Sequence, residues 1–369
     1  MQNVWFITEH HATSPVRTNF SFWAQHLTAA GVCVRWLTTG FSLLTTFGKN
    51  KRSFAKPHNE WVRFPSNSNL HSFTWRPHIH PANLGSKFFN AVSTPLFAAY
   101  PRMLPKNVAD QMSGADVFII ENGAAAMLAP IARKKSPAAK IIYLVNDRVE
   151  TIGYHPIIKK SELQALASVD VLVGVAEALV DDYPLFDRKV YIPHGLEKEA
   201  FGTCNVNPYA KGKNAVSVGD MLFDERVFLK LAEIFPDWTF HLFGTYATLS
   251  TKLPNVIEYG RRPFEELLPY MMHADIGIAP YGPGRDSDYL SQSSLKMIQY
   301  TYCRLPILAP DFAKGARAHV CSYDPHDLSD IESAFSMAMA YDRSSIDTSG
   351  ILTWPQVFDQ MMSAADRFS

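Results

Sequence analysis

The sequence predicts an α/β protein made of two Rossmann-like domains that face each other across a cleft. Its 369 residues exceed the usual size of one hydrophobic core and suit two. Short apolar runs recur along the chain with helical patterns between several of them, which is typical of parallel sheets covered on both faces. Residues 196–213, rich in Gly, Asn and Lys, interrupt this alternation and are expected to link the domains.

The first domain is expected over residues 1–195. A helix is predicted over residues 20–31, closed by Gly31, because glycine is common just past helix ends. Residues 40–110 are rich in Pro, Ser, His and aromatic side chains and show few regular patterns, so we expect strands and long loops there. The predicted strands are 4–8, 32–37, 61–64, 116–121, 140–145, 171–175 and 189–193.

The second domain is expected over residues 214–350, with helices at 224–235 and 263–272. Residues 351–369 form an amphipathic helical pattern that could pack back on the first domain. Ligands of such folds bind where the strands end, so a site is expected at these ends. The predicted strands are 215–219, 238–244, 255–260, 274–280 and 305–310.

Charge is unevenly distributed, although the net charge is zero. Residues 1–109 hold eleven Lys and Arg but only two acids, Glu9 and Glu60, so this part carries +9 and the rest −9. An anionic partner is therefore indicated, and nucleic acid, an anionic membrane and a lipid diphosphate all fit. A solvated basic face without a partner remains the alternative.

Several classes of site and location are disfavoured. The four cysteines are scattered, which fits a reducing cytoplasm rather than a disulfide framework or zinc site. The first residues lack the pattern of a signal peptide, and no apolar stretch is long enough to span a membrane, so neither is expected. HExxH and GxGxxG motifs are absent from the sequence, and its Cys and His residues form no spaced cluster, so we expect no catalytic metal and no dinucleotide cofactor.

The stretch "SQSSLKMIQY" (291–300) resembles the start of an anion-binding helix. It follows a strand and a Gly-rich loop, and free N–H groups at a helix N-terminus attract anions. Ser293 and Ser294 could donate hydrogen bonds to a diphosphate, Lys296 adds a charge, and Gln299 could reach a ribose hydroxyl. A serine N-cap followed by a solvated lysine is the alternative interpretation.

Other candidate residues follow predicted strands. Gly219 and Gly244 would let a nucleotide approach the backbone, or would simply make tight turns. Asp147 could act as a general base, or cap the next helix. The further candidates, each of which could instead be structural, are Glu121, His10, His11 and His194.

Taken in order, several motifs resemble the GumK-like glucuronosyltransferases of glycosyltransferase family 70, enzymes of GT-B fold that build the xanthan repeat unit. The second half carries "SVGDMLFD", "HLFG", "IGIAPY" and "DYLSQSSLKMIQY". The first half carries "SPAAKIIYLVND", "HG" at 194–195, and the set His10, Pro15, Arg17 and Asn19. The resemblance covers roughly residues 1–310, with residues 40–105 matching least.

The resemblance implies roles for the residues that match. Asp147 corresponds to the catalytic base of an inverting transfer. The chain departs from the family pattern at two places. His11 stands where the family has an acid, and Arg261 and Arg262 stand where the family has Glu-Met. An arginine there could pair with a uronic carboxylate. The positions matching the lining of the UDP-sugar site are Met221, Tyr281, Ser294, Lys296 and Gln299.

The resemblance thus predicts a bacterial exopolysaccharide enzyme that moves a sugar, expected to be glucuronic acid, from a UDP-sugar to a polyprenyl-diphosphate oligosaccharide. It would work without a metal, bound peripherally to the cytoplasmic face of the inner membrane. The acceptor side would comprise His10, His11, Arg17 and Glu121. The basic region 40–110 would dock on anionic lipid.

Two alternatives share the predicted fold. One is a retaining transferase that uses UDP-glucose, and the other is a non-catalytic nucleotide-sugar-binding partner. Fold alone distinguishes neither from the leading prediction. A nucleic-acid binder is disfavoured, because no basic stripe alternates with aromatics in a recognisable motif.

Overall fold

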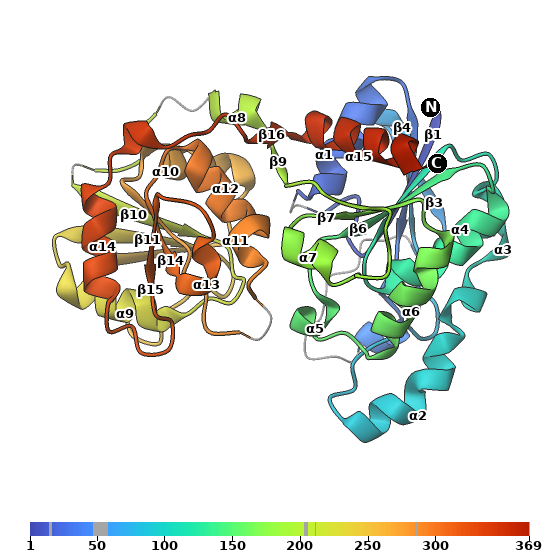
Figure 1. Cartoon of the computed structure of the whole chain (residues 1–369), viewed down its shortest axis with the longest axis horizontal. Helices are drawn as coiled ribbons and strands as arrows, with labels where there is room; N and C mark the ends of the chain where they lie inside the picture. Colours follow the sequence, from blue (N-terminus) through green and yellow to red (C-terminus); the bar gives the residue numbers. More distant parts are fainter. Residues whose placement is uncertain (15–16, 47–57, 203–205, 211, 285–286, 369) are drawn as a thin grey trace. The chain divides into compact units, whose positions relative to one another are not determined.

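The computed structural model describes residues 1–14, 17–46, 58–202, 206–210, 212–284 and 287–368 (Figure 1). It divides into two compact units, Met1–Pro193 with Trp354–Ser369, and His194–Thr353. The segment 196–213, expected to be a linker, therefore lies within the second unit. The predicted Pro15 of the N-terminal motif falls outside the described residues.

The first unit is built on an eight-stranded sheet in the order β3-β4-β2-β1-β5-β6-β7-β8. All neighbouring strands are parallel except β3 and β4. All seven strands predicted for this half are present, and β4 is an additional one. The strands are β1 (Asn3–Thr8), β2 (Cys33–Thr38), β3 (Trp61–Phe64), β4 (Asn67–Thr74), β5 (Val117–Glu121), β6 (Lys140–Val145), β7 (Val171–Gly174) and β8 (Lys189–Tyr191).

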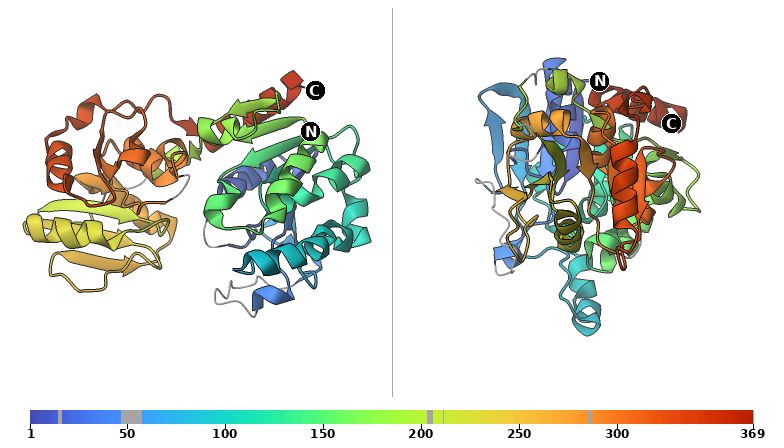
Figure 2. Two further views of the ribbon diagram at one scale, coloured as in Figure 1. Left: turned by 60° about the horizontal axis from the view of Figure 1, so that its bottom comes forward. Right: turned by 90° about the vertical axis from the view of Figure 1, so that its left-hand side faces the viewer.

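Helices complete this unit, and the last of them comes from the other end of the chain. In α15 the carbonyl of Trp354 accepts a hydrogen bond from Trp23 Nε1 (3.1 Å), and its ring stacks on Phe22. Both termini therefore lie on the first unit (Figure 2). The helices are α1 (Asn19–Ala29), α2 (Lys87–Ala98), α3 (Lys106–Gln111), α4 (Ala129–Lys135), α5 (Val149–Ile152), α6 (Ile157–Ala165), α7 (Glu177–Asp181) and α15 (Trp354–Phe368), with 3₁₀ turns η1 (Leu43–Thr46), η2 (Tyr100–Met103), η3 (Ala124–Leu128) and η4 (Leu166–Ser168).

The second unit has a six-stranded parallel sheet in the order β12-β11-β10-β13-β14-β15. The five predicted strands are present, and β15 is additional. The strands are β10 (Lys213–Val218), β11 (Trp238–Phe243), β12 (Val256–Gly260), β13 (Ile276–Ile278), β14 (Ile307–Pro310) and β15 (Val320–Tyr323). A separate parallel pair joins β9 (Gly195–Leu196) and β16 (Leu352–Thr353).

Helices of the second unit include both predicted ones. The first, α9, begins after Asp224, whose carboxylate caps it by accepting from the N–H of Arg226. Its apolar side joins a core with Phe240 and Phe335. The helices are α8 (Lys198–Gly202), α9 (Glu225–Ile234), α10 (Phe264–His273), α11 (Leu290–Ser293), α12 (Leu295–Tyr302), α13 (Asp311–Lys314) and α14 (Ile331–Ala340), with one 3₁₀ turn, η5 (Arg343–Ser345).

Both units thus have parallel sheets with helical crossovers, and the predicted Rossmann-like fold class is confirmed. Parallel strands gather their carboxyl ends at one edge. In the first unit this edge carries the residues that follow β1, β5 and β6, and in the second unit those that follow β10, β11 and β13. Among the helices of the described residues, none combines the length and apolar character needed to cross a bilayer.

Candidate functional site

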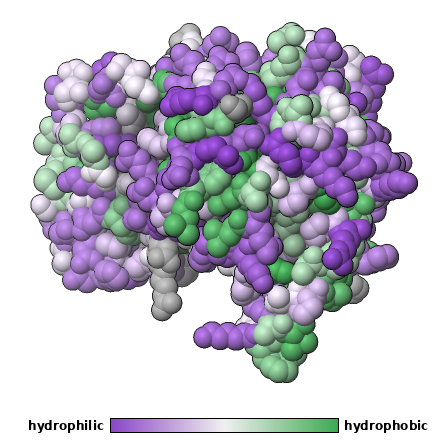
Figure 3. All heavy atoms as spheres, turned by 45° about the vertical axis from the view of Figure 1, so that its right-hand side comes forward, coloured by the Kyte–Doolittle hydropathy of each residue, from purple (hydrophilic) through white to green (hydrophobic). Residues whose placement is uncertain are grey.

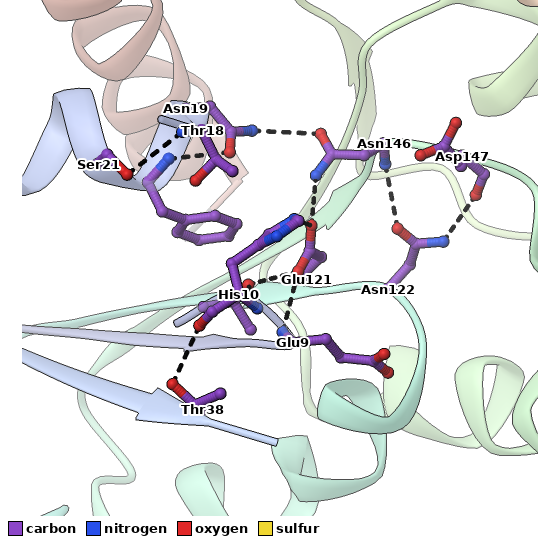
Figure 4. Close-up of polar contacts among 12 residues, drawn as sticks. Glu9, His10, Thr18, Asn19, Ser21, Thr38, Glu121, Asn122, Asn146 and Asp147 are labelled. Carbon is purple, nitrogen blue, oxygen red and sulfur yellow. Dashed lines mark hydrogen bonds and ion pairs between the residues drawn. The ribbon is translucent and has the colours of Figure 1, made fainter. Parts of the chain in front are cut away.

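The first unit holds a polar network centred on Glu121, the last residue of β5 (Figure 4). Because β5 lies between β1 and β6, side chains from all three strand ends reach this carboxylate. Glu121 accepts hydrogen bonds from Thr8 Oγ1 (2.5 Å), the Glu9 N–H (3.2 Å) and Asn146 Nδ2 (2.8 Å). His10 Nε2 lies 3.3 Å from its other face, as an ion pair when the ring is charged.

These neighbours keep Glu121 ionised. Burial by itself raises the pKa of a carboxyl group, and Glu121 is buried. The charge of His10 and the hydrogen bonds from His10, Thr8 and Asn146 outweigh that effect, so the pKa of Glu121 lies below its usual value. The network therefore contains a buried anion whose donors are already in place.

His10 is the member of this network that solvent and ligands can reach. Its side chain is 45% exposed, against 8% for Glu121. Its backbone is fixed, because its carbonyl accepts hydrogen bonds from Trp36 Nε1 (2.8 Å) and Thr38 Oγ1 (3.0 Å). The imidazole is thus held against Glu121 while remaining accessible.

Asp147, the predicted base, follows β6 on the same edge of the sheet. Its carbonyl accepts a hydrogen bond from Asn122 Nδ2 (2.6 Å), and Asn122 Oδ1 in turn accepts from the Asn146 N–H (3.1 Å). Figure 4 shows the Asp147 carboxylate directed away from Asn122. The alternative that Asp147 caps the next helix is wrong, because the residue at the N-cap of α5 is Arg148, which forms an ion pair with Asp182 (2.7 Å).

The other residues predicted on the acceptor side have different surroundings. His11 packs its ring against Phe41, with centroids 4.6 Å apart. Arg17 donates to Gln25 Oε1 (2.6 Å) and lies over the ring of Phe22, both on α1. The structure therefore brings Glu121 and His10 together and directs Arg17 to α1.

In the second unit the predicted helix start is a helix break. The short helix α11 ends at Ser293, the backbone of Ser294 is extended, and α12 begins at Leu295. Ser294 caps α12, because its Oγ accepts from the N–H of Met297 (3.3 Å). The same hydroxyl lies 2.5 Å from the hydroxyl of Tyr281. The N-cap interpretation of Ser294 is confirmed, whereas the solvated lysine that accompanied it is not.

Lys296, on the first turn of α12, directs its ammonium into the protein. Its Nζ is buried and has no hydrogen-bond partner among the residues that the structure describes. It lies 4.9 Å from the ring centre of Tyr281 and 3.8 Å from the point where a Cβ on Gly219 would be. Burial lowers the pKa of Lys296 to about 8, and the charge of Asp220 partly opposes this. Such a cation is costly to bury unless an anion binds it.

Two glycines shape the backbone around this ammonium. Gly219, directly after β10, has φ of +91°, a conformation that glycine adopts readily and other residues rarely do. A Cβ on Gly244, after β11, would lie 2.3 Å from Asp220 Oδ1. That oxygen accepts hydrogen bonds from the N–H groups of Tyr246 (2.6 Å) and Ala247 (3.1 Å). The ends of β10 and β11 are thereby joined through Asp220.

The remaining residues predicted to bind the donor differ in burial and in their position in the second unit. Ser293 and Gln299 are buried beside it in α11 and α12, while Met221 is 40% exposed. Arg261 and Arg262 are exposed and follow β12, the edge strand, which β11 separates from β10. Arg262 forms an ion pair with Glu266 of the same unit, with 3.6 Å between Nη1 and Oε2.

Some residues of these sites were not predicted from the sequence. Asp220 directly follows Gly219 at a strand end, and that position is the signal that could have indicated it. Thr8, Asn122 and Asn146 likewise end or follow strands. Burial lowers the pKa of the candidate His194 to about 4, which leaves it neutral at pH 7. Within the described ranges no cluster of three His, Cys, Asp or Glu side chains is arranged to hold a metal.

Comparison with known proteins supports the predicted family. Residues 6–175 match the family model of the glucuronosyltransferase GumK, N-terminal domain. A UDP-glucuronate:glycolipid 2-β-glucuronosyltransferase from Xanthomonas campestris pv. campestris is 27% identical over 358 residues, which cover 96% of this chain and 88% of the relative.

Solved structures of sugar-transferring enzymes share the fold. A UDP-forming α,α-trehalose-phosphate synthase from Burkholderia xenovorans matches with a TM-score of 0.64 and 12% identity, over 100% of this chain and 99% of the other. Sucrose-phosphate synthase from Thermosynechococcus elongatus matches with a TM-score of 0.61 and 12% identity, over the same shares. The predictions of a GT-B fold and of a glycosyltransferase are confirmed, and the non-catalytic alternative is not supported. This chain is thus similar to the GumK N-terminal domain over residues 6–175 and, over most of its length, to a UDP-glucuronate:glycolipid glucuronosyltransferase.

Proposed function

We propose that the protein transfers glucuronic acid from UDP-glucuronate to a polyprenyl-diphosphate-linked oligosaccharide, with inversion, in bacterial exopolysaccharide synthesis. The observation that carries the proposal is the buried ammonium of Lys296 at the start of α12. The Xanthomonas relative, whose name states a UDP-glucuronate donor and a glycolipid acceptor, supports the choice of substrates.

Lys296 would bind the diphosphate of the donor. The ammonium lies next to Gly219, where no side chain blocks the backbone, and α12 adds the positive end of its dipole. As the sugar leaves, negative charge grows on the departing phosphate oxygen, and a buried cation stabilises it strongly. Lys296 and the free N–H groups at the start of α12 would therefore stabilise the leaving diphosphate, as a metal ion does in other transferases. No metal is proposed.

Asp147 would act as the general base. The acceptor hydroxyl oxygen forms a bond to the anomeric carbon, the bond from that carbon to the phosphate oxygen breaks, and the hydroxyl proton passes to the Asp147 carboxylate. Attack from the face opposite the phosphate inverts the anomeric centre. His10, oriented by Glu121, would contact the acceptor sugar on the same edge of the sheet. Arg261 and Arg262 are proposed to meet the uronic carboxylate.

A lipid-linked acceptor requires the protein to work at a bilayer surface. We place it peripherally on the cytoplasmic face of the inner membrane, where nucleotide sugars are available. The positive charge of residues 1–109 supports attachment to anionic lipid.

The test is transfer to an extracted lipid-linked oligosaccharide from each of four donors, namely UDP-glucuronate, UDP-glucose, UDP-galactose and GDP-mannose. The proposal expects transfer from UDP-glucuronate above the others and a product of opposite anomeric configuration. A retained configuration would indicate the retaining alternative. Exclusive use of GDP-mannose would overturn the uridine donor.

A further inference from the structure

The helix α2 presents an apolar face that the described residues leave exposed. Four large side chains are exposed on its 12 residues, Phe88 by 70%, Phe89 by 57%, Val92 by 64% and Leu96 by 54%. They are spaced by four residues or lie next to one another, so they share one side of the helix. Figure 3 shows the result as a hydrophobic tip at the place of α2 in Figure 1.

This helix is held firmly in that position by its other side. The two buried residues of α2 are Asn90 and Phe97. The Asn90 side chain donates to Asn83 Oδ1 (3.0 Å) and accepts from the Leu84 N–H (2.9 Å), while its carbonyl lies 3.0 Å from His155 Nε2. Phe97 packs edge-on against the ring of His155. The exposed face is therefore part of an ordered element with specific polar anchors.

The charge of the surrounding sequence complements an anionic surface. Residues 61–109 contain five Lys and Arg and no Asp or Glu, and Lys87 is the first residue of α2. A short helix with aromatic and aliphatic residues on one face, set among cations, fits the interface of an anionic bilayer. Its 12 residues span only about 18 Å, well short of the roughly 30 Å hydrocarbon core, so it would lie in the interface and not cross it.

We propose that α2 is a membrane-inserting element that places Phe88, Phe89, Val92 and Leu96 among the lipids of an anionic bilayer, with Lys87 at the headgroups. This deepens the proposed function, because it names the element that would bring the enzyme to a lipid-linked acceptor. It also replaces a purely electrostatic attachment by residues 40–110 with apolar insertion at one helix. Vesicle binding needs no catalysis, so its outcome is separate from that of the transfer assay.

The first experiment is flotation of the full-length protein with vesicles of phosphatidylglycerol and phosphatidylethanolamine, or of phosphatidylcholine alone. The double variant Phe88→Ser, Phe89→Ser should bind anionic vesicles at least about tenfold more weakly, because two buried aromatic rings are lost. The matched control is Leu185→Ser, which removes a 98% exposed apolar side chain elsewhere in the same unit and should bind normally. Circular dichroism and UDP binding would verify that each variant is folded.

The second experiment measures insertion directly. In Phe88→Trp, added anionic vesicles should shift the tryptophan emission to the blue, and lipids brominated on their acyl chains should quench it, beyond the response of the unsubstituted protein. High salt should weaken binding without abolishing it. Unchanged flotation of the double variant, or an added tryptophan that shows neither shift nor quenching, would overturn the proposal. If substitutions on this face leave vesicle binding unchanged but abolish a defined complex with another protein, the face would be assigned to a protein partner instead.

Discussion

The two units treat their key charged group in opposite ways. In the first unit, Glu121 is buried with donors from Thr8, Glu9, Asn146 and His10 around it. In the second unit, the ammonium of Lys296 is buried with no hydrogen-bond partner in the part of the chain that the structure describes. One charge is satisfied by the protein, and we propose that a bound anion satisfies the other.

This difference suggests different tasks. A fully hydrogen-bonded carboxylate stabilises the fold and holds its neighbours in fixed orientations. A buried and unpaired ammonium destabilises the protein alone and strengthens the binding of an anion. The carboxyl-end edge of the first unit's sheet would thus be a preformed site for the acceptor and the base. The corresponding site in the second unit would be complete only when a diphosphate is bound.

The largest effect is expected for Asp147→Asn. Loss of a general base lowers turnover by roughly 10²- to 10⁴-fold, while donor binding, which we propose for the second unit, should be unchanged. The measurement is the rate of transfer at saturating donor, with UDP affinity measured alongside. Asp181→Asn, an exposed acid on α7, serves as the control. Near-normal turnover of Asp147→Asn would remove Asp147 as the base.

Glu121→Gln should reduce stability by about 2–4 kcal/mol, because the buried network loses the negative charge and one of its two acceptor oxygens. The pKa of Glu121 is lowered in the folded state, so its contribution is present above the ordinary value of 4.5 and is lost as pH falls through the folded value. Urea unfolding of both proteins should therefore give curves that converge on acidification below about pH 4.5. A constant difference across that range would contradict the described network.

Gly244→Ala should cost about 1–3 kcal/mol, since the new methyl group would overlap Asp220 Oδ1 and displace the loop that Asp220 holds. The control is Gly202→Ala in α8, where a Cβ meets no atom within 4 Å and stability should stay the same or rise slightly. Thermal unfolding compares the two. Equal melting temperatures for both variants would show that Asp220 does not pack as described.

Lys296→Met should leave stability unchanged or raise it slightly near pH 7, because it removes a buried charge. The folded pKa of about 8 lies below the ordinary 10.5, so the cost of burying the charge is present below pH 8 and is relieved as pH rises toward 10.5. The unsubstituted protein should thus gain stability relative to the variant between pH 8 and 10.5 in urea titrations. A variant that is clearly destabilised at pH 7 would show that Lys296 has a structural partner.

Much of the fold could be predicted because buried parallel strands have continuous apolar sequences. The exceptions are instructive. β4 reads "NSNLHSFT", and only its last three residues are buried, so it lacks the continuous apolar run that marks most of the other strands. The segment 196–213 has a loop-like composition, but β9 and α8 lie in it and belong to the second unit.

The sequence indicated which residues belong to the candidate sites, but not which of them contact one another. Polar residues after apolar runs indicated Glu121, His10 and Asp147, and the pattern of an anion-binding helix start indicated Lys296. Glu121 and His10 form a pair because β5 lies next to β1 in the sheet. This strand order could not be derived from the positions of the strands along the sequence. The burial of the Lys296 ammonium could not be predicted either, since a lysine on the first turn of a helix is usually solvated.

The central claim is that the second unit binds a diphosphate through Lys296. Calorimetric titration of UDP into the full-length protein and into Lys296→Met tests it most directly, at pH 7 and again at pH 9. The account predicts that the variant binds UDP about 10- to 100-fold more weakly at pH 7, and that only the unsubstituted protein loses affinity as pH passes about 8. Equal affinities of the two proteins at pH 7, with the same dependence on pH, would contradict it.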